Sequence, residues 1–179
     1  MVGDLDLGVP SARSARSTVE LVETIYDAHQ RELFTFAVRA CRDHEAAEDL
    51  VHEAFIRLIG EMQADRTPRQ VRAWLYRVVA NLIVSQARHA IVVERHASTT
   101  RDDVGPERTY LDREQQSYLD IALGELGEDA RTALLMAASG FNGMEIADAI
   151  GRSGNATRTL MSRTRLQLRH RLESNGTFP

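Results

Sequence analysis

The sequence predicts an all-α protein made of two small helical domains joined by a flexible linker. Apolar residues recur at spacings of three and four along several long segments, which is the period of an amphipathic helix. Helix-capping residues stand directly before most of these segments. No segment shows a convincing strand pattern, and one stretch near the C-terminus has the pattern of a helix-turn-helix.

Two helices are predicted at the start of the first domain. Ser17 and Glu20 form a capping box at the start of a helix that runs to about residue 42. Asp43 then caps a second helix, whose apolar stripe extends to Ile59 and which is followed by a loop at about residues 64–66. The second helix has a broad apolar stripe and an acidic outer side, so we expect one face to be buried and the other to be exposed.

A third helix is predicted from Thr67 as its cap and Pro68 as its first helical position, with Gln70 completing a capping box. Its expected core residues are Val71, Leu75, Val78 and Leu82. A separate polar stripe on this helix consists of Trp74, Arg77, Asn81 and Arg88. An aromatic ring, guanidinium groups and an amide are what a protein uses to hold unpaired bases. The same stripe could equally consist of a core tryptophan with solvated arginines.

Residues 96–112 contain Gly-Pro and mixed charges without periodicity, and they predict a linker. Two helices, at about residues 113–126 and 128–139, are expected after it. Asn142 and Glu145 then form a capping box for a short helix ending at Ile150.

The helix-turn-helix is completed by a turn at Gly151 and by a second helix that Ser153 caps. The residues of this second helix that should pack inward are Thr157, Met161, Thr164, Leu168 and Leu172. From residue 151 to 172 the segment holds six arginines and no acid, although the whole chain has a formal charge of −4. This local inversion of charge favours contact with DNA phosphates, whereas a lone basic run would more simply be a solvated face.

Composition excludes several classes of protein. All 22 basic residues are arginine, so chemistry that needs a lysine, such as a Walker A loop or a Schiff base, is excluded. Cys41 is alone, so no internal disulfide is expected, in keeping with a reducing cytoplasm. No secretory signal, membrane span or cofactor motif is recognisable. His44, Glu48 and His52 have metal-ligand spacing, but no matching ligand helix accompanies them, so we predict no metal site and a hydrated acidic face.

Taken together, these motifs resemble those of the extracytoplasmic-function (ECF) class of bacterial RNA polymerase sigma factors, over residues 19–172. HEAAEDLVHEAFIRLI (residues 44–59) is similar to the acidic helix of sigma region 2, and VRAWLYRVVANLIVSQAR (71–88) to the segment that reads the minus-ten element. ALLMAASGFNGMEIADAIGRSGNATRTLMSRTRLQLRHRL (133–172) is similar to region 4, which reads the minus-thirty-five element. The sequence departs from the family at RHAIVVERH (88–96), where a basic run is usual, and at Thr157, where an aliphatic residue is usual.

The resemblance implies a division of the chain and a role for each part. The expected parts are a disordered tail (1–16), region 2 (17–95), the linker (96–112) and region 4 (113–174). The implied core-polymerase-binding residues are Glu48, Asp49, Leu50 and Glu53. The implied minus-ten residues are Arg72, Trp74, Arg77, Asn81 and Arg88. The implied minus-thirty-five residues are Ser153, Asn155, Arg158, Thr159, Ser162, Arg163 and Arg165.

The implied function is that of a cytoplasmic transcription initiation factor without catalytic residues. Its implied partners are bacterial core RNA polymerase, promoter DNA and an anti-sigma factor. Three alternatives remain at this point: a stand-alone helix-turn-helix regulator, a sigma-like protein that titrates an anti-sigma factor, and a metal-dependent helical enzyme.

Overall fold

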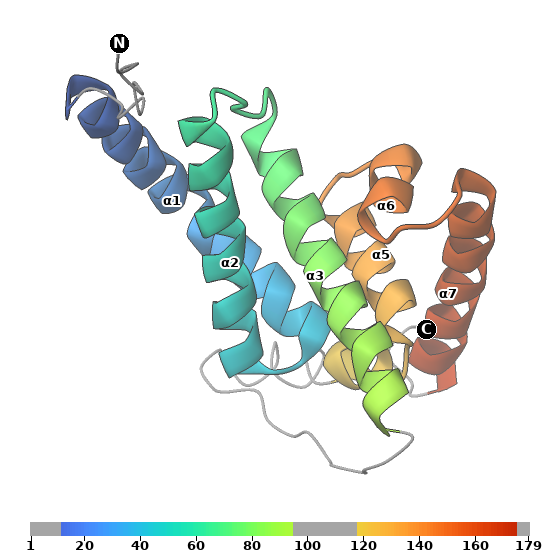
Figure 1. Cartoon of the computed structure of the whole chain (residues 1–179). Coiled ribbons are helices and arrows are strands. Elements are labelled where there is room, and N and C mark those ends of the chain that lie inside the picture. The colour runs from blue at the N-terminus through green and yellow to red at the C-terminus, as the bar shows by residue number, and fades with distance from the viewer. Residues whose placement is uncertain (1–11, 95–117, 175–179) are drawn as a thin grey trace.

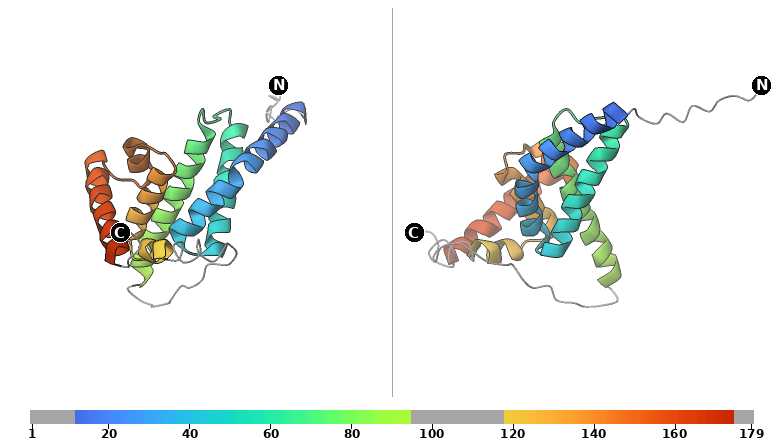
Figure 2. Two further views of the ribbon diagram at one scale, coloured as in Figure 1. Left: turned by 180° about the vertical axis from the view of Figure 1, so that it is seen from behind. Right: turned by 90° about the vertical axis from the view of Figure 1, so that its left-hand side faces the viewer.

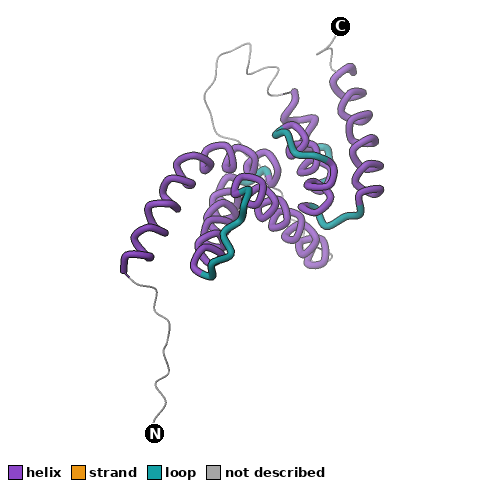
Figure 3. The backbone as a smooth tube through the Cα atoms, turned by 90° about the horizontal axis from the view of Figure 1, so that it is seen from above, coloured by secondary structure: helices purple, strands orange, loops and turns teal. Residues whose placement is uncertain are grey.

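The computed structural model describes residues 12–94 and 118–174, and every regular element in these ranges is a helix (Figure 3). The N-terminal half consists of α1 (Ala12–Cys41), α2 (His44–Gln63) and α3 (Val71–Glu94). The C-terminal half consists of residues 118–124, α5 (Glu128–Ala138), α6 (Gly143–Ala149) and α7 (Gly154–Ser174). The predicted linker at 96–112 lies outside the described residues. No described helix combines the length and apolar character needed to cross a bilayer.

The helices lie side by side, with α3 between α2 and the C-terminal helices (Figure 1). The view from behind gives the same order (Figure 2). A single buried cluster runs through both halves: it includes Leu33 of α1 and Leu58 of α2, and also Met136 of α5 and Ile150 after α6. The two halves therefore share one hydrophobic core in this structure.

Several predicted caps are confirmed. The Asp43 side chain accepts a hydrogen bond from the Ala46 amide at 3.0 Å, at the start of α2. Asn142 and Glu145 form the predicted capping box of α6. The Ser153 hydroxyl accepts from the Ala156 amide at 3.3 Å at the start of α7. These bonds satisfy amides that helix geometry leaves without a partner.

Two predicted helix starts are wrong. α1 begins at Ala12 rather than at Ser17, because the preceding residues are alanine, arginine and serine with no glycine or proline to oppose a helix. α3 begins at Val71, after both Thr67 and Pro68. The chain reverses direction after α2 through Asp65, whose φ is +55°, and the first helical acceptor of α3 is the Gln70 carbonyl, bonded to the Trp74 amide at 3.0 Å.

The predicted core face of α3 is only partly correct. Leu75 is 1% exposed, but Val78 and Leu82 are only half-buried. Val79 and Ile83 are fully buried instead. The reason is that α3 packs against helices of both halves, so it buries a wider and rotated face than a helix with neighbours on one side.

A buried arginine joins the two halves. Arg131 of α5 is 4% exposed, and its Nε donates to the Ala40 carbonyl at the end of α1 at 2.7 Å. Its Nη1 donates to the Leu126 carbonyl at 3.0 Å, and Nη2 lies 3.9 Å from a carboxylate oxygen of Glu128. Burial lowers the pKa of the Arg131 guanidinium, and the nearby Glu128 carboxylate opposes that shift. Nothing in the sequence pattern marked Arg131 as a core residue.

Thr157 provides a test of the packing under α7. Its side chain is 2% exposed, and its hydroxyl is one of two buried side-chain oxygens without a hydrogen-bond partner within the described residues. Since burying an unbonded hydroxyl is costly, Thr157→Val is expected to raise the free energy of unfolding by about 1 kcal/mol. Chemical denaturation of the purified variant measures this gain.

Thr164→Val is the matched control on the same face of α7. Thr164 is equally buried, but its hydroxyl donates to the Leu160 carbonyl at 2.8 Å. Removing a bonded hydroxyl should leave stability unchanged or lower it. A loss of stability in Thr157→Val would contradict the unpaired hydroxyl.

Candidate functional site

The acidic face of α2 is exposed as predicted. Glu48 and Asp49 point to solvent, while the half-buried Glu53 accepts a hydrogen bond from Arg57 at 2.7 Å. Leu50 is different: it is 2% exposed and belongs to the shared core. Leu50 therefore holds α2 against its neighbours, and of the predicted polymerase-binding residues only the carboxylates Glu48, Asp49 and Glu53 reach the surface.

The polar stripe of α3 is divided. Trp74 is half-buried and packs against the core, and Asn81 is exposed. The three arginines of the minus-ten set, Arg72, Arg77 and Arg88, each contact the C-terminal half. The structure thus pairs these arginines with residues that no sequence pattern connected to them.

Arg72 lies near the N-terminus of α3, where it contacts both α1 and the C-terminal half. Its Nε donates to Glu32 of α1 at 3.0 Å, and its Nη2 donates to the Ser139 carbonyl at the end of α5 at 3.3 Å. The guanidinium carbon lies 5.0 Å from the ring centroid of Tyr76 and 5.2 Å from that of Phe141. Burial alone would raise the pKa of Glu32, but hydrogen bonds from Arg72 and His29 outweigh it and lower that pKa below its usual range.

Arg77 and Arg88 meet acidic residues of the other half. Arg77 Nη1 lies 3.0 Å from Asp148 Oδ2 at the end of α6. Arg88 Nη2 donates to the Ile150 carbonyl at 2.9 Å and lies 3.6 Å from Asp129 Oδ2. Sequence reasoning missed Asp129 and Asp148. A single acidic residue in a short helix does not indicate a partner in a distant part of the chain.

The residues of α7 that were predicted to contact DNA are exposed. Asn155, Arg158 and Thr159 are exposed in the first turns of the helix. Arg158 Nη1 donates to Asn155 Oδ1 at 3.2 Å, and the Thr159 hydroxyl donates to the Asn155 carbonyl at 3.1 Å. The remaining exposed residues of the predicted set are Ser153, Ser162, Arg163 and Arg165.

The turn before α7 is shaped by Gly151, whose φ is +63°, a value that side chains with a Cβ rarely adopt. The inward face of α7 is also as predicted, with Thr157, Met161 and Thr164 buried and Leu168 and Leu172 half-buried. The geometry is that of a helix-turn-helix whose second helix presents arginines, an amide and hydroxyls outward.

His44, at the start of α2, has ordinary contacts. His44 Nδ1 lies 3.7 Å from Glu48, and its ring meets Phe34 edge-on with centroids 4.9 Å apart. Across residues 12–94 and 118–174, no three histidine, cysteine or acidic side chains are arranged to hold a metal ion.

Similarity to known proteins extends over most of the chain. The family model "Sigma-70 region 2" matches residues 25–90. The ECF RNA polymerase sigma factor SigE of Mycolicibacterium smegmatis is 27% identical over 156 residues, covering 83% of this chain and 60% of SigE. SigL of Mycobacterium tuberculosis is 28% identical over 166 residues, covering 87% of this chain and 89% of SigL. This chain therefore matches most of SigL but only about three-fifths of SigE.

Among solved structures, the fold is similar to that of the sigma factor RpoE from Bartonella quintana, determined in complex with the anti-sigma factor NepR. The TM-score is 0.67 and the identity 24%, covering 84% of this chain and 96% of RpoE.

Proposed function

We infer that this chain, which belongs to the ECF class of RNA polymerase sigma factors in the sigma-70 family, binds bacterial core RNA polymerase and directs it to particular promoters. The carboxylates Glu48, Asp49 and Glu53 on α2 would dock on a basic surface of the polymerase. The chain would act in the cytoplasm and would leave the chemistry of transcription to the polymerase.

The observation that carries this proposal is the separation of charge between two exposed faces of one chain. The acidic face of α2 lies in one half, and the outer face of α7, which has arginines and no acid from residue 154 to 172, lies in the other. An acidic face suits a basic protein surface, whereas arginines at a helix-turn-helix suit DNA. A stand-alone DNA regulator would have no use for the first of these faces.

A polymerase-binding and transcription assay tests the proposal. The purified chain should co-elute with bacterial core RNA polymerase at low salt, and the resulting complex should transcribe a limited subset of a random promoter library. DNA binding without polymerase association would favour the stand-alone regulator. Binding to an anti-sigma factor without any transcription would favour the titrating protein.

Sequestration by an anti-sigma factor is a further part of the proposal. RpoE, whose fold this chain shares, was solved with such a partner. An anti-sigma factor that held the two halves together would cover both DNA-facing surfaces.

Arg158→Ala is expected to weaken use of the upstream promoter element by about 1–3 kcal/mol, since Arg158 is exposed on the face of α7 that enters the major groove. The measurement compares open-complex formation on a promoter selected from the library with that on the same promoter with its upstream element mutated. The loss should be large on the first DNA and small on the second.

Arg169→Ala is the matched control, because it removes the same charge from the same helix near its far end. This variant should lose affinity to the same small extent on both DNAs. An equal loss on both DNAs for Arg158→Ala would make Arg158 a phosphate contact and contradict base reading.

A further inference from the structure

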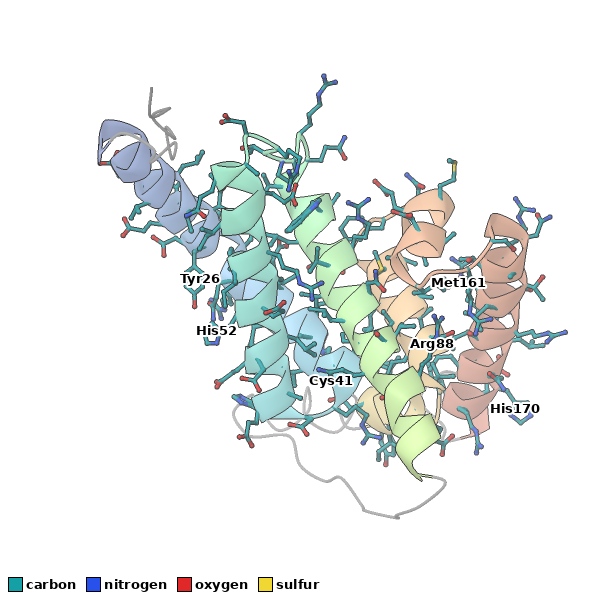
Figure 4. All side chains as sticks on the ribbon, in the orientation of Figure 1. Tyr26, Cys41, His52, Arg88, Met161 and His170 are labelled. Carbon is teal, nitrogen blue, oxygen red and sulfur yellow. The ribbon has the colours of Figure 1, made fainter. Side chains whose placement is uncertain are left out.

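The C-terminal half contacts the three arginines that the family resemblance assigns to minus-ten DNA. Arg72, Arg77 and Arg88 come from one helix, α3, at three levels along its length. Each has at least one oxygen acceptor in the C-terminal half, at distances of 2.9–3.3 Å. Figure 4 shows Arg88 between α3 and the C-terminal helices.

The acceptors are chemically similar to a nucleic-acid backbone. Two are carboxylates, Asp148 for Arg77 and Asp129 for Arg88. Two are main-chain carbonyls at helix C-termini, Ser139 after α5 and Ile150 after α6, where helix geometry leaves carbonyls without intrahelical partners. An arginine fork binds anionic oxygens of carboxylate and phosphate with the same geometry. These oxygens can therefore replace phosphate oxygens at the same guanidinium groups.

Asp129 also connects Arg88 to the helix-turn-helix. Its carboxylate is only 18% exposed and accepts a hydrogen bond from Arg152 Nε at 2.7 Å, in addition to lying 3.6 Å from Arg88. Arg152 is in the turn between α6 and α7. One carboxylate thus joins α3 of the N-terminal half to the turn that positions the recognition helix.

We propose that the C-terminal half is an intramolecular competitor for minus-ten DNA, in which Asp129, Asp148 and the carbonyls of Ser139 and Ile150 hold Arg72, Arg77 and Arg88 until the halves separate. The chain alone binds an opened DNA strand weakly, because the strand must first displace these contacts. The proposal rests on the proposed function only for the identity of the competing ligand.

The Arg77–Asp148 pair is weak enough to be displaced. The Arg77 and Asp148 side chains are 48% and 64% exposed, and exposed pairs of this kind contribute little to stability and weaken in salt. A competitor of this strength delays binding until a partner such as polymerase draws the halves apart. It does not block binding outright.

The test measures binding of the full chain to a fluorescein-labelled single-stranded DNA 20-mer of random sequence by fluorescence anisotropy at low salt. The variant Asp129→Asn/Asp148→Asn should bind about tenfold more tightly than the matched control, since it removes both the Arg77–Asp148 pair and the Arg88–Asp129 pair, each worth a factor of a few. The control is Glu61→Gln/Glu173→Gln, which makes the same change in net charge away from the junction, at the half-buried Glu61 and the exposed Glu173.

A second pair of variants makes the result specific to one contact. Asp148→Asn alone should tighten DNA binding, and this gain should vanish in an Arg77→Ala background, because the arginine that it frees is gone. Equal DNA affinity of Asp129→Asn/Asp148→Asn and its control, Glu61→Gln/Glu173→Gln, would overturn the competitor. A gain that persists without Arg77 would also overturn it, since the effect would then be one of overall charge.

The two proposals fail in distinguishable ways because the DNA assay contains no polymerase. A chain that never associates with core polymerase, yet binds DNA more tightly when Asp129 and Asp148 are replaced, would contradict the proposed function and keep the competitor. A chain that binds polymerase normally, and whose variants match their controls on DNA, would support the proposed function and overturn the competitor.

Discussion

Replacing Asp49 by arginine is expected to abolish association with core RNA polymerase while the helical fold persists. Asp49 is exposed on α2, and none of its side chain is needed to fill the core. If a basic polymerase surface faces it, the substitution brings two positive charges together, which costs several kcal/mol at an interface. We expect an affinity loss of at least about a hundredfold in a polymerase-binding assay, with an unchanged circular dichroism spectrum.

Asp27→Arg is the matched control for this prediction. Asp27 is also an exposed aspartate in a helix, but it lies on α1 rather than on the acidic face of α2. The control variant should bind polymerase nearly as the unchanged chain does. Equal binding by Asp49→Arg and Asp27→Arg would place the polymerase contact elsewhere on the molecule.

Arg131→Met is expected to cause the largest loss of stability, about 3 kcal/mol in the free energy of unfolding. The substitution keeps the apolar stem of the side chain but removes a buried guanidinium that donates to the carbonyls of Ala40 and Leu126. Both carbonyls would lose a charged donor that methionine has no group to replace. Denaturant unfolding followed by circular dichroism measures the difference.

Arg57→Met is the control, because it removes an arginine whose side chain is 50% exposed and pairs with Glu53 on the same helix. Such a pair is worth about 0.5 kcal/mol or less. The contrast between the two variants isolates the effect of burial. A loss below about 1 kcal/mol in Arg131→Met would mean that solvent reaches these carbonyls once the arginine is gone.

The confirmed sequence predictions depend on neighbours within four residues. Asp43, Asn142 and Ser153 bond amides two or three positions along the chain, so their roles are written in the local sequence. The buried and exposed faces of α7 follow from helical spacing in the same way. The helix starts at Ser17 and Thr67 were wrong because a capping pattern permits a start without preventing the helix from beginning earlier or later.

The sequence by itself therefore determined that the chain is all-helical, that α2 offers an acidic face and that α7 offers an arginine-rich one. Only the tertiary structure decided which face of α3 is buried, that Arg131 is a core residue, and that Arg72, Arg77 and Arg88 have acceptors in the other half. The partners in those contacts are 62 to 91 residues apart. A periodic pattern reports which way a side chain points from its own helix, but not which helix packs there, because that depends on how the whole chain shares one core.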